Sequence, residues 1–212
     1  MRTDRLDRIR DGGVIAILRG VQRDDAVAVA DAVVDAGVTA LEVTADTPNA
    51  MSSIEAIADR VDDAIVGAGT VLDAETARAA QLAGAEFLVT PTVNRDVIRT
   101  ANRYGTPIAV GAYTPTEALD AFEAGADLVK VFPAKTGGPA HVAAIGGPLP
   151  QVPLVPTGGV GAGNAGDYVD AGAVAVGVGS SIVDDEAIAD GDFDAIRANA
   201  RAVIEAVSAA RE

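Results

Sequence analysis

Short apolar runs rich in β-branched residues alternate along the chain with longer, Ala-rich amphipathic stretches. Eight such runs occur, and a turn rich in Gly, Thr or Pro follows them. Strands that are apolar almost throughout are typical of a parallel sheet covered by helices. The eight expected strands are 14–20, 40–44, 65–70, 87–91, 108–112, 128–134, 154–160 and 173–181.

The stretches between the runs carry residues that begin and end helices. Thr114 is followed by Pro115 and Glu117, which is the pattern of a capping box. Asp73 opens another stretch in a similar way. A glycine follows four of the stretches, at the place where a left-handed residue ends a helix. These glycines are Gly37, Gly84, Gly125 and Gly172.

Eight strand–helix units are the number that closes a parallel barrel, and 212 residues lie near the short end for that fold. We therefore predict a single α/β domain over residues 1–212, a (β/α)8 or TIM barrel. A doubly wound open sheet is the alternative. The charged segment 2–10 is expected to form an extra N-terminal helix that closes one end of the barrel.

The excess of acidic over basic residues limits the kinds of partner that the chain can bind. The chain has 31 acids against 16 bases and a formal charge of −15. This argues against nucleic acid and anionic membranes as partners, because both require a basic face. The acids are spread along the chain, as in a solvated acidic surface. The scattered acids, the presence of only two lysines and the core of Ala and Val together indicate adaptation to a salt-rich cytoplasm.

The chain contains no cysteine, which excludes disulfides and thiolate metal sites. Its first residues are charged and lack the apolar region of a secretory signal. No uncharged apolar run approaches the length of a membrane span. We therefore expect a cytoplasmic protein.

The C-terminal ends of the strands form the active site in a (β/α)8 barrel. Three ionisable residues, Arg19, Glu42 and Lys130, stand in otherwise apolar runs near those ends. The full set of candidates at the strand ends is Arg19, Glu42, Thr44, Thr70, Pro91, Lys130, Phe132, Thr157, Gly158, Gly159, Gly179 and Ser180.

Lys130 is expected to point into the barrel, because side chains alternate along a strand and Val129 and Val131 would pack against the helices. The same alternation sends Glu42 inward, so the two should be close neighbours. One interpretation is a buried ion pair, which adds little net stability. The other is a Schiff-base lysine. Burial disfavours the charged form of an amine, and the neutral amine attacks a ketone while a nearby carboxylate moves protons.

Two Gly-rich strand ends predict a phosphate site. The segments "PTGGV" and "VGVGSS" end the seventh and eighth strands, where barrels often bind phosphate through backbone N–H groups. His141 and Lys135 are expected at the surface. The acid pairs at 62–63 and 184–185 are interpreted as exposed loop residues and not as metal ligands, because no His or third carboxylate accompanies either pair.

From about Arg8 to Ala206 the chain resembles the 2-keto-3-deoxy-6-phosphogluconate/4-hydroxy-2-oxoglutarate aldolases. The markers, in family order and spacing, are "IAILRG", "LEVT", "IVGAGTVLD", "FLVTPTVN", "VKVFPA", "PTGGV" and "GVGSS". The resemblance implies a class I lyase on a (β/α)8 barrel. It would cleave a 2-keto-3-deoxy-6-phospho sugar acid to pyruvate and glyceraldehyde 3-phosphate, as in Entner–Doudoroff metabolism. It also implies a homotrimer that needs no metal or cofactor.

The resemblance further implies roles for individual residues. Lys130 would form the Schiff base, and Glu42 would be the acid/base. Thr70 would bind the pyruvate carboxylate, with Arg19 contributing to anion binding. Of the others, Phe132 and Pro91 would line the pocket, while Gly158, Gly159 and Ser180 would hold the phosphate.

Asp46 departs from the phosphogluconate branch, in which an arginine typically stands four residues after the glutamate and binds the substrate carboxylate. The 6-phosphogalactonate branch lacks that arginine and has a small polar residue followed by a pair similar to "SP", which "DTP" here resembles. The resemblance therefore leaves both epimers as substrates, with Asp46 as the specificity candidate. Either Asp46 turns away and Arg19 takes over the anion, or Asp46 accepts hydrogen bonds from sugar hydroxyls.

Two functions of other classes also fit a phosphate-binding barrel. One is an isomerase or synthase, for example of amino-acid biosynthesis. The other is a non-catalytic barrel that binds a phosphorylated metabolite. An inward Lys130 beside Glu42 counts against both, because such isomerases mainly use carboxylates or histidines and a silent barrel needs no such pair.

Overall fold

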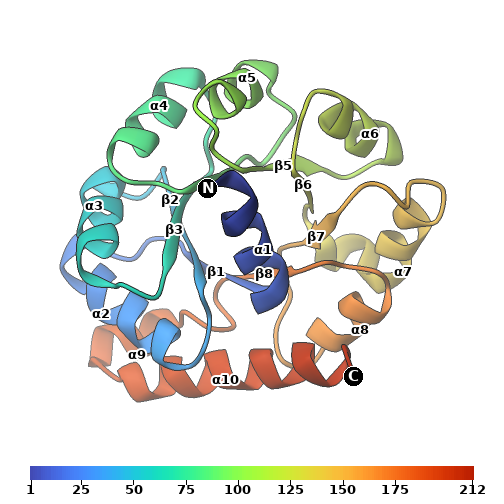
Figure 1. The fold of residues 1–212 in the computed structure, drawn as a ribbon. Helices are drawn as coiled ribbons and strands as arrows, with labels where there is room; N and C mark the ends of the chain where they lie inside the picture. Colours follow the sequence, from blue (N-terminus) through green and yellow to red (C-terminus); the bar gives the residue numbers. More distant parts are fainter.

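Eight parallel strands form the centre of the computed structural model, which describes residues 1–212, and helices surround them (Figure 1). The strands are β1 (Val14–Leu18), β2 (Ala40–Thr44), β3 (Ile65–Gly69), β4 (Phe87–Val89), β5 (Ile108–Ala112), β6 (Leu128–Val131), β7 (Leu154–Pro156) and β8 (Val176–Val178).

The strands are arranged in a nearly closed ring. Each strand from β1 to β6 pairs with the next one in the sequence, and β8 pairs with β1. Between β7 and β8 a single parallel bridge, from Thr157 to Gly177, completes the ring. The predicted (β/α)8 barrel is therefore confirmed, and the open-sheet alternative is wrong.

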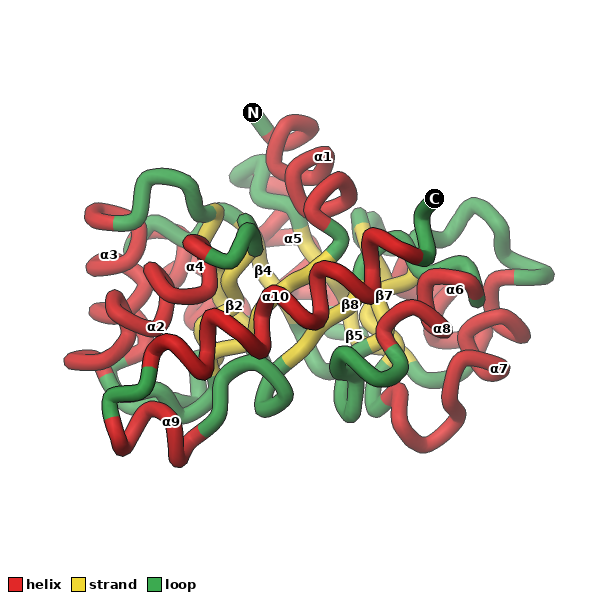
Figure 2. The backbone as a smooth tube through the Cα atoms, turned by 90° about the horizontal axis from the view of Figure 1, so that it is seen from below, coloured by secondary structure: helices red, strands yellow, loops and turns green.

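Helices cover the outside of the ring, and Figure 2 shows them on either side of the strands. They are α1 (Arg2–Gly12), α2 (Arg23–Asp35), α3 (Ala50–Arg60), α4 (Ala74–Leu82), α5 (Arg95–Arg103), α6 (Pro115–Glu123), α7 (Ala134–Gly146), α8 (Ala165–Asp170), α9 (Asp185–Asp190) and α10 (Phe193–Ala209).

The local signals in the sequence act as expected at the helix ends. The Thr114 hydroxyl accepts a hydrogen bond from the Glu117 backbone N–H, and the two residues form a capping box. Asp73 caps α4 by accepting from the Thr76 N–H at 2.6 Å. The four glycines expected to end helices all have positive φ, from 96° to 107°.

Six of the expected strands are longer than the observed ones: 14–20, 65–70, 87–91, 128–134, 154–160 and 173–181. Thr, Pro or Gly residues occur within the first two positions after each of these strands, and they form the loops at the C-terminal face. Proline cannot donate to a ladder, and glycine is free to adopt turn conformations. The excess residues therefore belong to the loops that build the site.

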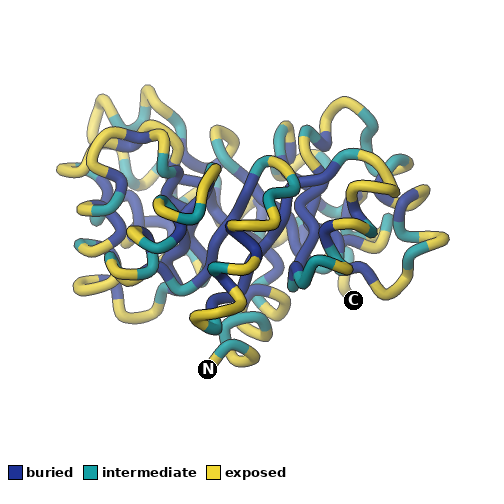
Figure 3. The backbone as a smooth tube through the Cα atoms, turned by 90° about the horizontal axis from the view of Figure 1, so that it is seen from above, coloured by how far each residue is buried: buried dark blue, intermediate teal, exposed yellow.

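The hydrophobic core has two layers. An outer cluster of 51 buried residues lies between the strands and the helices, and an inner cluster of 10 fills the barrel. Figure 3 shows the buried strands at the centre and the exposed positions on the outer helices. The inner cluster occupies one end of the barrel, so the other end is left for polar side chains.

Helix α1 closes the N-terminal end of the barrel, as predicted, and projects from the ring in Figure 2. Its Ile9 belongs to the inner cluster and is 1% exposed. Arg2 donates to both carboxylate oxygens of Asp127, at 3.0 and 2.6 Å, and Arg5 donates to Glu86 at 2.7 Å. With that end closed, a ligand can enter only from the C-terminal face.

Candidate active site

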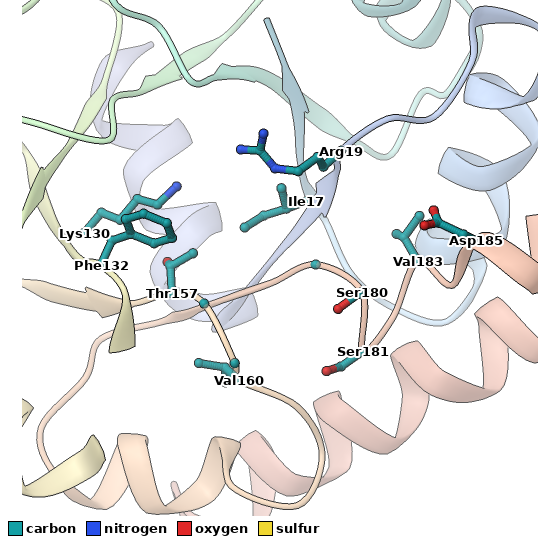
Figure 4. Close-up of a pocket in the computed structure, with 13 residues that line it drawn as sticks. Ile17, Arg19, Lys130, Phe132, Thr157, Val160, Ser180, Ser181, Val183 and Asp185 are labelled. Atoms are coloured by element: carbon teal, nitrogen blue, oxygen red, sulfur yellow. The ribbon is translucent and has the colours of Figure 1, made fainter. Parts of the chain in front are cut away.

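A cavity of about 480 Å³ opens at the C-terminal face (Figure 4). Its walls come from the ends of β1, β6, β7 and β8 and from the loops that follow them. Eight of the residues expected at the site line it: Arg19, Lys130, Phe132, Thr157, Gly158, Gly159, Gly179 and Ser180.

Lys130 and Glu42 meet inside the barrel, as the alternation along β2 and β6 predicts. The Lys130 Nζ lies 3.6 Å from the Glu42 Oε1, and the two side chains are 8% and 2% exposed. This distance exceeds the normal range of a hydrogen bond. The buried Glu42 Oε1 has no hydrogen-bond partner. An unpaired buried carboxylate oxygen next to an amine can exchange a proton with a group that reacts at that amine.

Gly69 provides the space for the Glu42 carboxylate. A Cβ at position 69 would lie 1.8 Å from the Glu42 Oε1 and 2.5 Å from its Cδ. Gly69 pairs with Thr44 in the neighbouring strand, two residues beyond the pair formed by Glu42 and Gly67. The glycine is therefore a requirement of this site and not of the strand.

Gly69→Ala should lower kcat by about tenfold or more, because the added methyl group displaces the Glu42 carboxylate from the Lys130 amine. The measurement is steady-state turnover by the purified variant. Gly163→Ala is the matched control, since a Cβ at position 163 has nothing within 4 Å. Equal activity of the two variants would contradict this role of Gly69.

Arg19 lines the cavity and is hydrogen-bonded to Asp46 and Thr70, which are not among the lining residues. The Arg19 Nη1 donates to the Asp46 Oδ2 at 2.5 Å, and its Nη2 donates to the Thr70 Oγ1 at 2.9 Å. Burial by itself raises the pKa of Asp46, but the Thr44 hydroxyl and the Arg19 guanidinium outweigh it and hold that pKa below its ordinary value. Asp46 thus remains ionised at neutral pH.

Asp46 pairs with Arg19 because β1 and β2 are adjacent and bring the ends of both strands together. Both expectations for Asp46, that it turns away from the substrate anion or that it accepts hydrogen bonds from sugar hydroxyls, stay predictions. Asp46 is nevertheless half exposed, at 49%, so its carboxylate remains accessible from the solvent.

The far end of the cavity is formed mainly by backbone. Gly158 and Gly159 follow β7 with φ of 92° and 79°, which L side chains rarely adopt. A Cβ at Gly159 would also lie 2.5 Å from the Lys135 Cβ. Gly179 and Ser180, which follow β8, line the same cavity. Successive peptide groups in such a turn can bind an anion through their N–H groups.

Some residues differ from the sequence expectation in position. Pro91 does not line this cavity but a neighbouring one, and Phe132 borders both. Conversely, sequence reasoning missed five residues that line the main cavity. Alternation in the first strand points to Ile17, and adjacency to Ser180 points to Ser181, but no local signal marks the rest. The five are Ile17, Val160, Ser181, Val183 and Asp185.

The minor candidates have mixed outcomes. His141 is not a free surface residue, because its Nε2–H donates to the Tyr113 carbonyl at 2.7 Å and its ring stacks on that of Tyr113. Lys135 is exposed, as expected. Asp184 is partly buried and caps α9 by accepting from the Ala187 N–H. The acids at 62–63 are exposed.

No three His, Cys, Asp or Glu side chains gather in a way that could hold a metal ion. None of the helices has both the length and the apolar character that a membrane crossing requires.

A (β/α)8 barrel with a buried lysine beside a buried carboxylate at its C-terminal end defines the class of Schiff-base, or class I, aldolases. Residues 6–199 match the family model described as KDPG and KHG aldolase. The chain belongs to the KDPG and KHG aldolase family.

Individual relatives resemble the chain over most of its length. The 2-dehydro-3-deoxy-6-phosphogalactonate aldolase of Escherichia coli (strain K12) is 41% identical over 171 residues, which are 80% of this chain and 83% of that protein. The 2-dehydro-3-deoxy-phosphogluconate aldolase of Treponema pallidum (strain Nichols) is 38% identical over 203 residues, which are 95% of each.

A solved structure extends the comparison to the chemistry. The KDPG aldolase of Legionella pneumophila, with pyruvate captured at low pH as a covalent carbinolamine intermediate, has a TM-score of 0.86 to this chain. The two are 31% identical, and the match covers 92% of this chain and 96% of that one.

Proposed function

We propose that this class I aldolase cleaves a 2-keto-3-deoxy-6-phospho sugar acid, in its gluconate or galactonate form, to pyruvate and glyceraldehyde 3-phosphate. The observation that carries the proposal is the buried pair of Lys130 and Glu42, 3.6 Å apart, with an unpartnered Glu42 oxygen beside the amine. Family membership supports the reaction class, and the relatives' names support this kind of substrate.

Lys130 and Glu42 suffice for the chemical steps. Lys130 passes its proton to Glu42, the neutral amine attacks the C2 ketone, and Glu42 returns the proton to the ketone oxygen, which gives a carbinolamine. Glu42 then carries a proton from the nitrogen to the hydroxyl group, so that water leaves and an iminium ion forms. The Glu42 carboxylate takes the C4 hydroxyl proton and the C3–C4 bond breaks, so that its electron pair moves to the iminium and forms an enamine while the aldehyde leaves. Protonation at C3 and addition of water release pyruvate and the free amine.

The rest of the cavity offers places for both ends of the substrate. Arg19 lines the same cavity as Lys130 and is hydrogen-bonded to Thr70, so the two suit the carboxylate, while Gly158, Gly159 and Ser180 suit the phosphate. Thr157 and Gly179 also line the cavity, and Phe132 forms its side wall. The Phe132 ring centre is 5.4 Å from the Lys130 Nζ, so the wall stands close to the amine.

Neither alternative function accounts for the pair. An isomerase or synthase that works through carboxylates or histidines has no use for Lys130. The only histidine, His141, is hydrogen-bonded to the Tyr113 carbonyl and does not line the cavity. A barrel that only binds a metabolite gains little from burying a lysine and a glutamate, because desolvation offsets their attraction. The aldolase makes use of both residues.

The proposal extends to the assembly and its setting. The family resemblance supports a homotrimer that acts in the cytoplasm without metal or cofactor, on a small phosphorylated keto acid. The charge of −15 and the Ala- and Val-rich composition support a salt-rich cytoplasm, where screening weakens repulsion among surface acids. Sedimentation of the purified chain at high salt tests the trimer, and a monomer there would contradict it.

Both phosphorylated epimers should be cleaved, with the galactonate form at least as good a substrate as the gluconate form. Asp46 carries a negative charge at a position where it can accept hydrogen bonds from sugar hydroxyls, and such contacts distinguish epimers. The measurement is kcat/KM for each epimer, side by side. Asp46→Arg should shift the ratio toward the gluconate form.

Two results would contradict this role of Asp46 in specificity. One is a wild-type preference for the gluconate form above about tenfold, because a hydrogen bond from the galactonate hydroxyl to Asp46 would oppose such a preference. The other is an epimer ratio that stays unchanged in Asp46→Arg. Neither result would touch the Schiff-base chemistry, which both epimers share.

A further inference from the structure

The exposed side chain of Arg19 would be poorly ordered before an anion binds to it. Its side chain is long and 56% exposed, so an isolated arginine there would sample many rotamers. Binding through such a side chain loses affinity, because the side chain must be ordered when the ligand arrives. A group that holds Arg19 in place before binding would remove this cost.

Two acceptors from two different strands hold the guanidinium. Asp46, from the turn after β2, accepts from the Arg19 Nη1 at 2.5 Å, and Thr70, after β3, accepts from the Nη2 at 2.9 Å. These contacts use two of the five N–H donors of arginine and leave three for a ligand. In Figure 4 the Arg19 guanidinium and the Lys130 side chain lie along the same cavity, with Ile17 beneath Arg19.

The backbone at the two acceptors is unusual. Thr70 has φ of 55°, and Asn49, in the turn that carries Asp46, has φ of 60°. These are the only non-glycine residues of the chain with positive φ. Such conformations cost free energy and persist where the surrounding structure requires them. Both lie in the two turns that present the acceptors to Arg19.

The turn that carries Asp46 is also tied to the strand end that carries Arg19. The Thr47 hydroxyl accepts from the Gly20 backbone N–H at 3.0 Å, and it lies 3.0 Å from the buried Thr44 hydroxyl. Gly20 directly follows Arg19, so the same turn binds both the backbone and the side chain of this segment. The contact is therefore part of a connected network and not an isolated surface ion pair.

We infer that Asp46 is a positioning residue for the substrate carboxylate: it orients the Arg19 guanidinium against Thr70, in the direction of the Lys130 amine, before the keto acid binds. The inference rests on the proposed function for the identity of the anion. It differs from the role of Asp46 in epimer choice, because positioning acts on the carboxylate that every substrate and pyruvate itself share.

Removal of Asp46 has two opposite effects on anion binding. Loss of the ion pair frees Arg19 and weakens binding, whereas loss of a negative charge near the anion strengthens it. At about 1 M salt the Debye length falls to about 3 Å, which suppresses the second effect but leaves a directly hydrogen-bonded pair largely intact. Measurements at about 1 M potassium chloride therefore isolate the positioning effect.

The probe is pyruvate, which has the carboxylate but no C4 hydroxyl. The readout is the pyruvate concentration that half-saturates borohydride trapping on Lys130, followed by mass spectrometry of the intact chain. In Asp46→Ala this concentration should rise by about three- to tenfold, the cost of ordering one long side chain. Asp46→Asn keeps an acceptor oxygen for the Arg19 N–H and should recover most of the loss.

A double-variant cycle tests whether Asp46 acts through Arg19. In Arg19→Ala, the further change Asp46→Ala should have no effect, because nothing is left to position. Asp96→Ala is the matched control, since Asp96 accepts from Arg99 at the same distance of 2.5 Å on α5, away from the cavity. It should leave the half-saturating concentration unchanged.

The kinetics of full cleavage give a second readout. Asp46→Ala should raise KM for both epimers and change kcat by less than about threefold, because positioning of the carboxylate is lost in ground state and transition state alike. Any difference in KM between the epimers beyond this shared rise reports the contact with the sugar hydroxyls and not the positioning. If Asp46 only stabilised the fold, Asp46→Ala would lower the melting temperature and kcat and would not raise KM selectively.

Three results would overturn the inference. The half-saturating concentration in Asp46→Ala could stay unchanged or fall, it could rise equally in the Arg19→Ala background, or Asp46→Asn could show no recovery. A wild-type chain that takes no pyruvate label at all would instead contradict the proposed function, so the two failures are distinguishable.

Discussion

Replacement of Lys130 by methionine should abolish cleavage of the keto acid, with a loss of at least about 10⁴-fold, the scale on which removal of a covalent nucleophile acts. Methionine keeps most of the length of the side chain but has no amine to attack the ketone. Borohydride with pyruvate should add one pyruvate-derived mass to the wild-type chain, on the peptide that contains Lys130. The variant should add none.

The second lysine provides the internal control. Lys135 is exposed on the first turn of α7, next to Gly159 at the edge of the same cavity, and it is the only other lysine of the chain. Lys135→Met should therefore retain the label and most of the activity. Label found on Lys135, or label retained by Lys130→Met, would contradict a Schiff base on Lys130.

The stability of the Lys130 variant carries separate information. Removal of one partner from a buried pair leaves the other as an uncompensated charge, which costs about 3–5 kcal/mol. The melting temperature of Lys130→Met should fall for this reason. The double variant Lys130→Met/Glu42→Gln should regain much of it, which separates loss of fold from loss of chemistry.

Glu42→Gln should lower kcat by about 10²-fold or more, the usual size of a general acid–base contribution. Glutamine keeps the shape of the side chain in the space that Gly69 leaves, but it cannot exchange a proton with the carbinolamine or the enamine. The Lys130 amine remains, so borohydride should still trap pyruvate, more slowly.

Two measurements therefore separate the roles of the pair. The label reports on the amine, and the turnover rate reports on the proton transfers. If Glu42→Gln keeps activity within a few-fold of wild type, Glu42 is only the structural partner of Lys130. If it loses the label entirely, the carboxylate is needed to form the Schiff base and not only to complete the cycle.

Much of the fold could be predicted from local patterns. The apolar runs predict the eight strands, because a strand buried on both faces must be apolar throughout. The capping box at Thr114 and glycines such as Gly37 mark the helix ends, because these residues satisfy backbone groups or adopt positive φ within a few residues of sequence. The predicted strands were too long where turn residues follow an apolar run.

The alternation of side chains along a strand also predicted that Lys130 and Glu42 point into the barrel. An ionisable side chain in the middle of an apolar run has to face either helices or the barrel interior, and alternation with its neighbours decides which. The meeting of these two residues could therefore be expected from the sequence. Their separation of 3.6 Å, the unpartnered Glu42 oxygen and the space left by Gly69 could not.

What the sequence by itself determined was the set of elements, their order and the faces of their side chains, since each depends on interactions within a few residues. What only the tertiary structure decided was which strand ends face each other. Asp46 read alone is a negative charge that should avoid an anion, but closure of the barrel brings β1, β2 and β3 side by side. Arg19 then bonds to Asp46 and Thr70 across 27 and 51 residues of chain, and no local pattern encodes contacts over such separations.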